Sequence, residues 1–290
     1  MVAGKDLFGA NKQKVRQMDT LLIDRYFGES KGNLRYLGLP ASTLTELMLW
    51  RDYFAHFSAV ERGNAEAPFI YQHNLVLTAL QHNLASRLRL LRGDIDDILK
   101  VGTDEFGNSL LYPYDVVSLD YSGGLIYKDE SGDAKRVEAI QSLITSQAQC
   151  NHDFLLFISI NTDNHDQGEI RRVIENIGSD LNNLGLDTSE VIEAYLHHPN
   201  EEARLKVYVP FVITQLSSTQ YQCEHFKPIF YSGNRDTRMI HFSAWMKRTR
   251  EYAAGRPSRQ TFVRILNLGV FECVDGQISE TDFGIKSINV

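Results

Sequence analysis

The chain has 290 residues, 43% hydrophobic and 23% charged, with a formal net charge of −7. A globular protein of this length buries a large core without needing disulfides. The negative net charge argues against a broadly basic surface that binds nucleic acid. A local basic patch is still compatible with it, and the candidate residues are Lys247, Arg248, Arg250, Arg256 and Arg259.

The N-terminal stretch MVAGKDLFGANKQKVRQ lacks the apolar run of a signal peptide, and no window of the sequence reaches the length of a membrane span. The three cysteines, Cys150, Cys223 and Cys273, lie far apart in the sequence and form no CxxC pair, so we interpret them as buried or free thiols in a reducing compartment. We therefore expect a cytoplasmic protein that does not insert into a membrane.

Hydrophobic periodicity predicts the first elements in chain order. Helices are expected over 11–27, 42–57, 66–88 and 134–149. Short strands are expected over 33–38, 57–61 and 88–92, followed by buried strands at 115–120 and 153–161. This alternation of strands and helices is typical of a mostly parallel sheet covered on both faces.

The second half of the chain predicts two more helices, over 169–185 and 189–198, and then three closing strands within 204–215, 226–233 and 238–248. A hairpin is expected at SGNRDTR, and residues 261–278 have a strand-like character that we do not place. The predicted fold class is therefore α/β, a Rossmann-like, mostly parallel seven-stranded sheet with helices on both faces and an antiparallel closing hairpin. We expect an N-terminal helical segment at 1–30, a main domain at 31–248 and a C-terminal extension at 249–290.

Three of the four first strands end at or next to an acid. The first strand ends at Gly38, the second at Glu61, the third near Asp94 and the fourth at Asp120. In an open α/β sheet ligands bind outside the carboxyl ends of the strands, and an acid about 20 residues beyond the first-strand turn is the position that holds ribose hydroxyls. Two glycines, Gly123 and Gly124, follow Asp120 and permit close backbone approach.

These features resemble the class I S-adenosylmethionine-dependent methyltransferases over roughly residues 30–245. The loop Asp120-Tyr121-Ser122-Gly123 is similar to the Asp-Pro-Phe-Gly loop of some RNA methyltransferases and of the bacterial three-Cys-motif partner proteins. The resemblance implies S-adenosylmethionine as cofactor. It places Gly38 and Pro40 against the methionine part, Glu61 at the ribose, Asp94 and Ile95 at adenine, and Asp120 with Tyr121 at the methyl-transfer site.

The first-strand turn departs from the family pattern of an acid followed by GxGxG. The sequence here is Tyr36-Leu37-Gly38-Leu39-Pro40-Ala41-Ser42, in which only the first glycine is kept and the acid is missing. Proline removes a backbone donor and stiffens the loop that a cofactor carboxylate needs to approach.

Three functions follow from the sequence. The first is an S-adenosylmethionine-dependent methyltransferase with nucleic acid as a candidate substrate, in which Asp120 accepts a hydrogen bond or proton from an amine. The second is a catalytically inactive methyltransferase-like subunit that binds a protein partner or nucleic acid, suggested by the altered turn. The third is a nucleotide-binding protein of another Rossmann-like type, which Glu61 would serve equally well.

Other polar clusters predict less. Asp163, His165 and Asp166 follow the fifth strand, but a turn and helix cap explains them better than a metal site, and we expect no metal. Ser122 lacks the G-x-S-x-G context of a nucleophile elbow. The mixture of Tyr231, Arg235, Arg238, His241 and Trp245 is compatible with a single-stranded nucleic-acid surface or with a plain hairpin.

Overall fold

A computed structural model describes residues 9–40, 44–62, 69–121, 123–125, 135–163, 165–233, 237–249 and 258–288. The strands are β1 (Leu34–Gly38), β2 (Phe54–Glu61), β3 (Leu88–Arg92), β4 (Val116–Asp120), β5 (Phe154–Asn161), β6 (Tyr221–His225), β7 (Ile229–Ser232), β8 (Arg238–Arg248), β9 (Val270–Val274) and β10 (Gln277–Thr281). The helices are α1 (Ala10–Phe27), α2 (Thr45–Trp50), α3 (Ile70–Gln81), α4 (Ile95–Val101), α5 (Lys135–Gln149), α6 (Gln167–Asn183), α7 (Ser189–Leu196), α8 (Glu202–Ser217) and α9 (Arg259–Leu266), with a short 3-10 turn at Gly28–Ser30.

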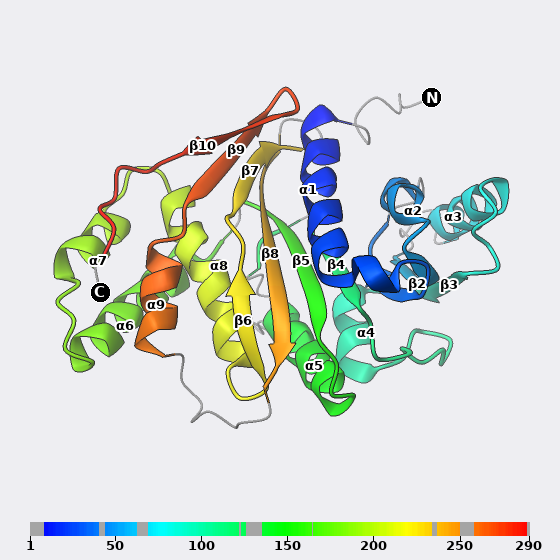
Figure 1. Cartoon of the computed structure of the whole chain (residues 1–290), viewed down its shortest axis with the longest axis horizontal. Coiled ribbons are helices and arrows are strands. Elements are labelled where there is room, and N and C mark those ends of the chain that lie inside the picture. Colours follow the sequence, from blue (N-terminus) through cyan, green and yellow to red (C-terminus); the bar gives the residue numbers. More distant parts are fainter. Residues whose placement is uncertain are drawn as a thin grey trace.

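The strands form one sheet in the order β10-β9-β7-β8-β5-β4-β1-β2-β3, with β6 also paired to β8. Strands β1 to β5 run parallel, and β8 runs antiparallel between β5 and the β6–β7 edge (Figure 1). The predicted Rossmann-like α/β fold class is confirmed, and so is the antiparallel pairing across the expected hairpin.

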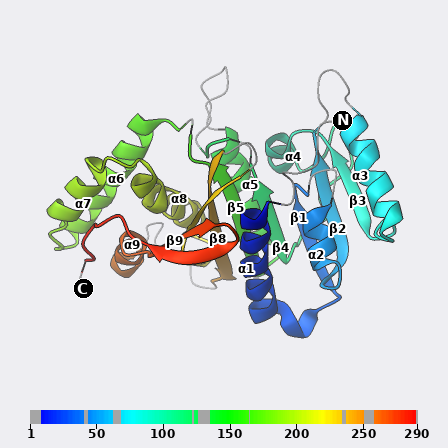
Figure 2. The same cartoon turned by 90° about the horizontal axis from the view of Figure 1, so that it is seen from above.

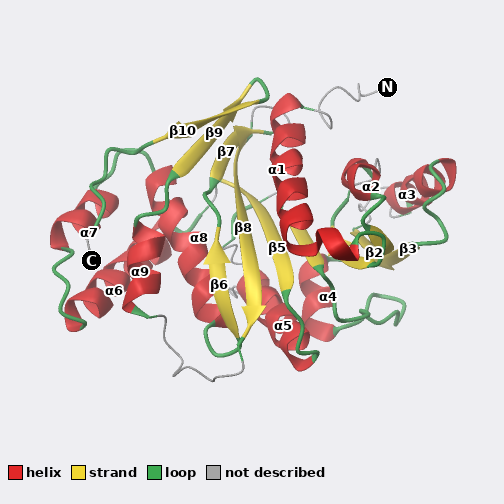
Figure 3. Ribbon diagram, in the orientation of Figure 1, coloured by secondary structure: helices red, strands yellow, loops and turns green. Residues whose placement is uncertain are grey.

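The described strands number ten rather than the seven expected. Two features account for the difference. The strand that lies next to β8 is divided into two separate strands, β6 and β7, which pair with different halves of β8. In addition, β9 pairs parallel to β7 and carries β10 beyond it, so part of the predicted C-terminal extension continues the sheet (Figure 3).

Two hydrophobic clusters lie on the two faces of the sheet. One contains side chains of α1, α2 and α3, including Ile23, Trp50 and Leu75, packed on Tyr36 and Phe57. The other joins α4 to α9 with the opposite faces of the same strands. Figure 2 shows this division, with α1 and α2 on one side of the sheet and α4 and α5 on the other.

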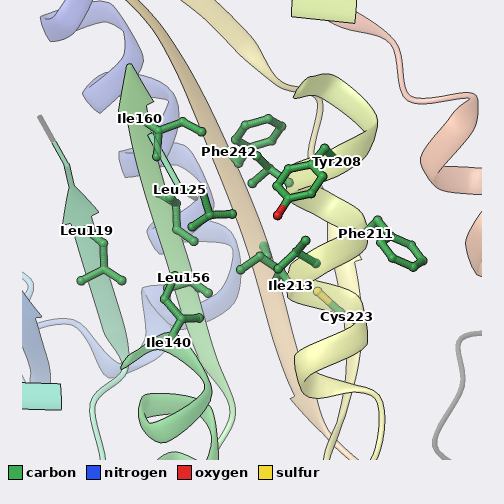
Figure 4. Close-up of a cluster of buried hydrophobic side chains, with 14 of the residues drawn as sticks. Leu119, Leu125, Ile140, Leu156, Ile160, Tyr208, Phe211, Ile213, Cys223 and Phe242 are labelled. Carbon is green, nitrogen blue, oxygen red and sulfur yellow. The ribbon is translucent and has the colours of Figure 1, made fainter. Parts of the chain in front are cut away.

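The segment 204–215, expected to be a strand, is part of the helix α8. This prediction was wrong because α8 is buried on nearly all sides and therefore shows no alternation of polar and apolar faces. Its β-branched residues, such as Val207 and Val209, imitate a buried strand. Figure 4 shows Tyr208 and Ile213 of this helix in the cluster that also contains Leu156 and Ile160 of β5.

Several predicted boundaries also shift. The helix expected over 42–57 ends at Trp50, and Phe54 already belongs to β2, whereas the helix expected over 66–88 occupies Ile70–Gln81. The tail 261–278, which we could not place, contains most of α9 and β9. The predicted strand ends at Gly38, Glu61 and Asp120 are confirmed.

Candidate functional site

The carboxyl ends of β1 to β4 meet at one edge of the sheet. Gly38 pairs in register with Ala59 of β2 and Ser118 of β4, so the sheet brings Gly38, Glu61 and Asp120 to the same edge. From β1 the chain adds β2 and β3 on one side and then β4 and β5 on the other, so the strand order reverses between β1 and β4. Open α/β sheets bind ligands at such a reversal. The predicted cofactor and catalytic positions thus belong to one region, which we call the carboxyl edge.

The side chain of Tyr36, from the same strand, covers Gly38. A Cβ atom at this position would be 2.2 Å from the Tyr36 hydroxyl and 2.5 Å from the Ser118 carbonyl oxygen. Glycine is therefore required here by internal packing alone. Pro40, the other residue predicted to meet methionine, is buried, and residues 41–43 of the same turn lie outside the described residues.

A buried carboxylate lies next to this glycine, although the sequence has no acid before it. Glu46 of α2 is 4% exposed and accepts a hydrogen bond of 2.6 Å from the Ser118 hydroxyl. Burial raises the pKa of Glu46, and the positive charge of Arg16 on α1 opposes that rise. The Tyr36 hydroxyl lies close to Ser118 and Glu46 but makes no hydrogen bond of normal geometry.

Two buried polar atoms in this group have no hydrogen-bond partner among the described residues: the Tyr36 hydroxyl and Nη1 of Arg16. We call Arg16, Tyr36, Glu46 and Ser118 the Glu46 cluster. Sequence reasoning missed it because its four residues lie on four separate elements, α1, β1, α2 and β4. In the structure the N-cap is Leu44, in a left-handed conformation with φ of 50° and no side-chain cap.

Glu61 ends β2 and is half-buried. Burial raises the pKa of its carboxyl group, while the backbone N–H of Arg62 opposes the rise. Among the described residues Glu61 has no ion-pair partner. Its carbonyl oxygen accepts from Gly93 N at 3.3 Å and from Gln72 Nε2 at 3.3 Å, which joins the end of β2 to the β3 turn and to α3.

A cavity of about 670 Å³ opens beside these strand ends and is lined by Arg62, Gly93 and Asp94. Its rim carries Phe69 and Phe106, which are 57% and 61% exposed. The guanidinium group of Arg92 lies 5.6 Å and 5.1 Å from the two ring centroids. Exposed aromatic rings beside a carboxylate are suited to a planar heterocycle with exocyclic donors.

Asp94 is the N-cap of α4, and Ile95 is the first residue of that helix. One oxygen of Asp94 caps the helix by accepting from Asp96 N at 2.9 Å, and the other pairs with Nη1 of the exposed Arg62 at 3.3 Å. The second oxygen can therefore exchange its partner for a ligand without uncapping the helix. Ile95 is 6% exposed and packs in the core, so in this structure it is mainly a packing residue.

Asp120 forms an ion pair with Lys12 of α1. A smaller cavity of about 220 Å³ adjoins this pair and is lined also by Tyr231, Gly233 and Met239. The amine that was predicted to face Asp120 is thus supplied here by the chain itself, from the helix that crosses this part of the sheet (Figure 1).

Tyr121 is 3% exposed and its side chain reaches α4, where its hydroxyl donates to Oδ1 of Asp96 at 2.9 Å. The guanidinium group of Arg136 lies 4.2 Å from the Tyr121 ring centroid. The ring therefore joins β4 to α4 and α5, while its neighbour Ser122 lies outside the described residues.

A network of buried polar side chains holds α1 against β5 and β8. Nε2 of His241 lies 2.9 Å from Oδ1 of Asp19, and Nδ1 of His241 lies 2.9 Å from the Ser159 hydroxyl. Ser243 also donates to Asp19, at 3.3 Å. All four side chains are buried under α1, so this Ser-His-Asp arrangement anchors the helix and offers no nucleophile to solvent.

The remaining predicted polar cluster follows β5. Asp166 caps α6 by accepting from Glu169 N at 3.1 Å, as expected for a turn and helix cap. Within the described ranges no group of three or more His, Cys, Asp or Glu side chains could hold a metal ion, and no helix is long and apolar enough to cross a membrane.

Comparisons with known proteins find only distant similarities. A family model described as PP_RS20740-like matches residues 93–205, and no curated protein matches the chain. Among solved structures, N-methyltransferase NodS from Bradyrhizobium japonicum WM9 is 9% identical with a TM-score of 0.41, covering 81% of this chain and 97% of NodS. The methyltransferase domain of bacterial CtHen1-C is 10% identical with a TM-score of 0.43, covering 81% and 98%.

A third similar structure, precorrin-6y C5,15-methyltransferase from Geobacter metallireducens GS-15, is 14% identical with a TM-score of 0.39 and covers 84% of this chain and 93% of its own. At TM-scores below 0.5 these likenesses assign no ligand, substrate or residue role to this chain.

Proposed function

We propose that this protein is an S-adenosylmethionine-dependent methyltransferase whose cofactor binds at the carboxyl edge. The observation that carries the proposal is the Glu46 cluster. A buried carboxylate, a buried unpartnered guanidinium nitrogen and a buried unpartnered hydroxyl lie together beside Gly38. Unpaired buried polar groups are costly, and the zwitterionic amino-acid end of a ligand would satisfy both charges.

The other strand-end residues suit the rest of the cofactor. Glu61 would accept hydrogen bonds from the ribose hydroxyls. The Asp94 oxygen that pairs with Arg62 would accept from the adenine amine once Arg62 moves. When bound, the cofactor supplies an electrophilic methyl group. Asp120 would then hold and orient the acceptor amine after Lys12 leaves it. Nucleic acid is our proposed acceptor class, by resemblance of the Asp120 loop, and the cytoplasm is the proposed location.

A second candidate is a catalytically inactive methyltransferase-like subunit that binds a protein or nucleic-acid partner. Two observations favour it. The Tyr36 hydroxyl occupies the space directly over Gly38, and Lys12 already neutralises Asp120. In this case the Glu46 cluster is an internal anchor for α1 and α2, and no small ligand enters it.

Calorimetric titration with S-adenosylmethionine and S-adenosylhomocysteine separates the two candidates. The methyltransferase predicts binding in the micromolar range, about 8 kcal/mol. Glu61→Ala should weaken it at least about tenfold, because two hydrogen bonds to a charged acceptor are lost. Glu29→Ala, at an exposed position of the turn after α1, is the matched control and should bind as the wild type does.

Absence of binding to the folded wild type would exclude the first candidate and leave the second. Tighter binding of ATP or NAD than of either methionine-containing ligand would instead identify a different nucleotide-binding protein.

A further inference from the structure

A third cavity lies at the opposite edge of the sheet, where β1, β2 and β3 begin. It has a volume of about 650 Å³ and its polar lining includes Arg35, His56, Ser58, Arg87 and Arg89. The described residues that line it include no Asp or Glu. Three guanidinium groups without a carboxylate are unusual in a chain whose net charge is −7. We call this cavity the arginine pocket.

The pairing of the strands creates the arginine pocket. Arg35 of β1 pairs in register with His56 of β2, and Ser58 of β2 pairs with Arg89 of β3. These residues alternate with Tyr36 and with other residues of the opposite, apolar face, so they all point to the same side of the sheet. Basic and hydroxyl side chains therefore converge there across three adjacent strands.

Two of the three arginines donate hydrogen bonds to backbone carbonyl oxygens. Arg35 donates to the carbonyl oxygens of residues 111 and 112, and Nη1 of Arg87 donates to those of Arg51 and Phe54 at 2.8 and 2.9 Å. These carbonyls are neutral acceptors, so the positive charges stay uncompensated. Both Arg35 and Arg87 are thereby held in fixed positions along the walls of the pocket.

Arg89 differs from the other two arginines because its guanidinium group makes no hydrogen bond to any of the residues that the structure describes. Its Nε atom is buried without a partner, and among the described residues none of the three arginines forms an ion pair with a carboxylate. Asp115, which accepts from the Arg35 backbone at 2.7 Å, is also bonded to His152 at 2.9 Å. A buried guanidinium nitrogen of this kind lacks an acceptor, and the pocket leaves room for one.

We propose that the arginine pocket binds a phosphate monoester of a small organic molecule. Guanidinium groups bind phosphate oxygens through paired, charge-assisted hydrogen bonds, and the hydroxyls of Ser58 and Ser86 add neutral donors. The wall beside the arginines contains Tyr114, whose ring lies 5.9 Å from the Arg35 guanidinium carbon. Tyr114 is itself buried, whereas the aliphatic side chains of Leu88 and Leu111 in the same lining suit the organic part of the ligand, and the volume is that of a small-molecule site.

Isothermal calorimetry at constant ionic strength tests this site with inorganic phosphate, uridine 5′-monophosphate and single-stranded oligouridylate as probes. A pyrimidine is chosen so that the probe does not compete for the proposed adenosine site at the carboxyl edge. The main variant is Arg89→Gln, which should fold because the Arg89 side chain makes no hydrogen bond within the described part of the chain. Arg171→Gln, an exposed arginine on α6, removes the same charge elsewhere and is the control.

The proposal predicts that uridine monophosphate binds more tightly than inorganic phosphate, that Arg89→Gln weakens its binding at least tenfold, and that Arg171→Gln leaves it unchanged. If both variants weakened the binding of uridine monophosphate equally, the loss would be explained by net charge alone, and the proposed site would be overturned. Binding of the oligonucleotide alone would assign the arginines to a nucleic-acid strand and overturn the small-molecule ligand. Failure of all three probes to bind would overturn the proposal entirely. None of these outcomes depends on whether the carboxyl edge binds S-adenosylmethionine.

Discussion

At the scale of single residues, the most informative side chain is Glu46. It is almost completely buried, and its one described hydrogen bond is from Ser118. A buried carboxyl group favours its neutral form, so the pKa of Glu46 is raised by burial despite the opposing charge of Arg16. Burial of this group therefore has a cost that depends on pH.

Replacement of Glu46 by glutamine should reveal that cost. Since the folded-state pKa lies above the ordinary value of 4.5, the native state binds more protons than the unfolded state, and wild-type stability falls as pH rises through the window above 4.5. Glu46→Gln keeps an acceptor for Ser118 but does not titrate. The difference in free energy of unfolding, variant minus wild type, should therefore increase between pH 4.5 and pH 8.

Urea denaturation across that pH range measures the difference, and Glu29→Gln at an exposed position serves as the control. A difference that is the same at both ends of the range would show that Glu46 does not titrate anomalously in the folded protein.

At the scale of elements, α1 is the helix that defines the carboxyl edge. It contributes Lys12 to Asp120, Arg16 to the Glu46 cluster and Asp19 to His241. It also contacts β7, β9 and β10 at the far part of the sheet. Polar contacts thus fix both where α1 lies and which charges the candidate site contains.

Asp19→Ala should lower the free energy of unfolding by about 3 kcal/mol, because it leaves buried His241 and Ser243 without their shared acceptor. Gln17→Ala changes an exposed residue of the same helix and should cost less than about 0.5 kcal/mol. Urea denaturation of both variants provides the comparison. Similar small losses for the two variants would show that the Asp19 network does not hold α1.

The sequence predicts a helix or strand well when only one of its faces is apolar, or when the strand is short and turn residues mark its ends. β4 was predicted with its correct end, because five strand residues are followed by a polar loop and glycines. α8 was not, because a helix buried on all sides has no polar face and its valines favour a strand. The Glu46 cluster could not be predicted, because its residues come from the four elements α1, β1, α2 and β4 and meet only through tertiary packing.

At the scale of the whole molecule, the parallel sheet has two edges with different chemistry. The carboxyl edge gathers the acids Glu46, Glu61, Asp94 and Asp120 from the strand ends and α2. The amino edge of β1 to β3 gathers arginines without acids. The sequence predicted the first edge through the spacing of strand ends, but the second edge required knowledge of the register between strands.

Hydrogen exchange of the full chain with and without S-adenosylhomocysteine is the measurement that tests the central claim most directly, because it locates the ligand. The account predicts slower exchange in residues 36–40, 59–62 and 90–96 and at α1 around Arg16, with no change at 86–89. Unchanged exchange along the carboxyl edge at saturating ligand, or protection confined to another region, would contradict it.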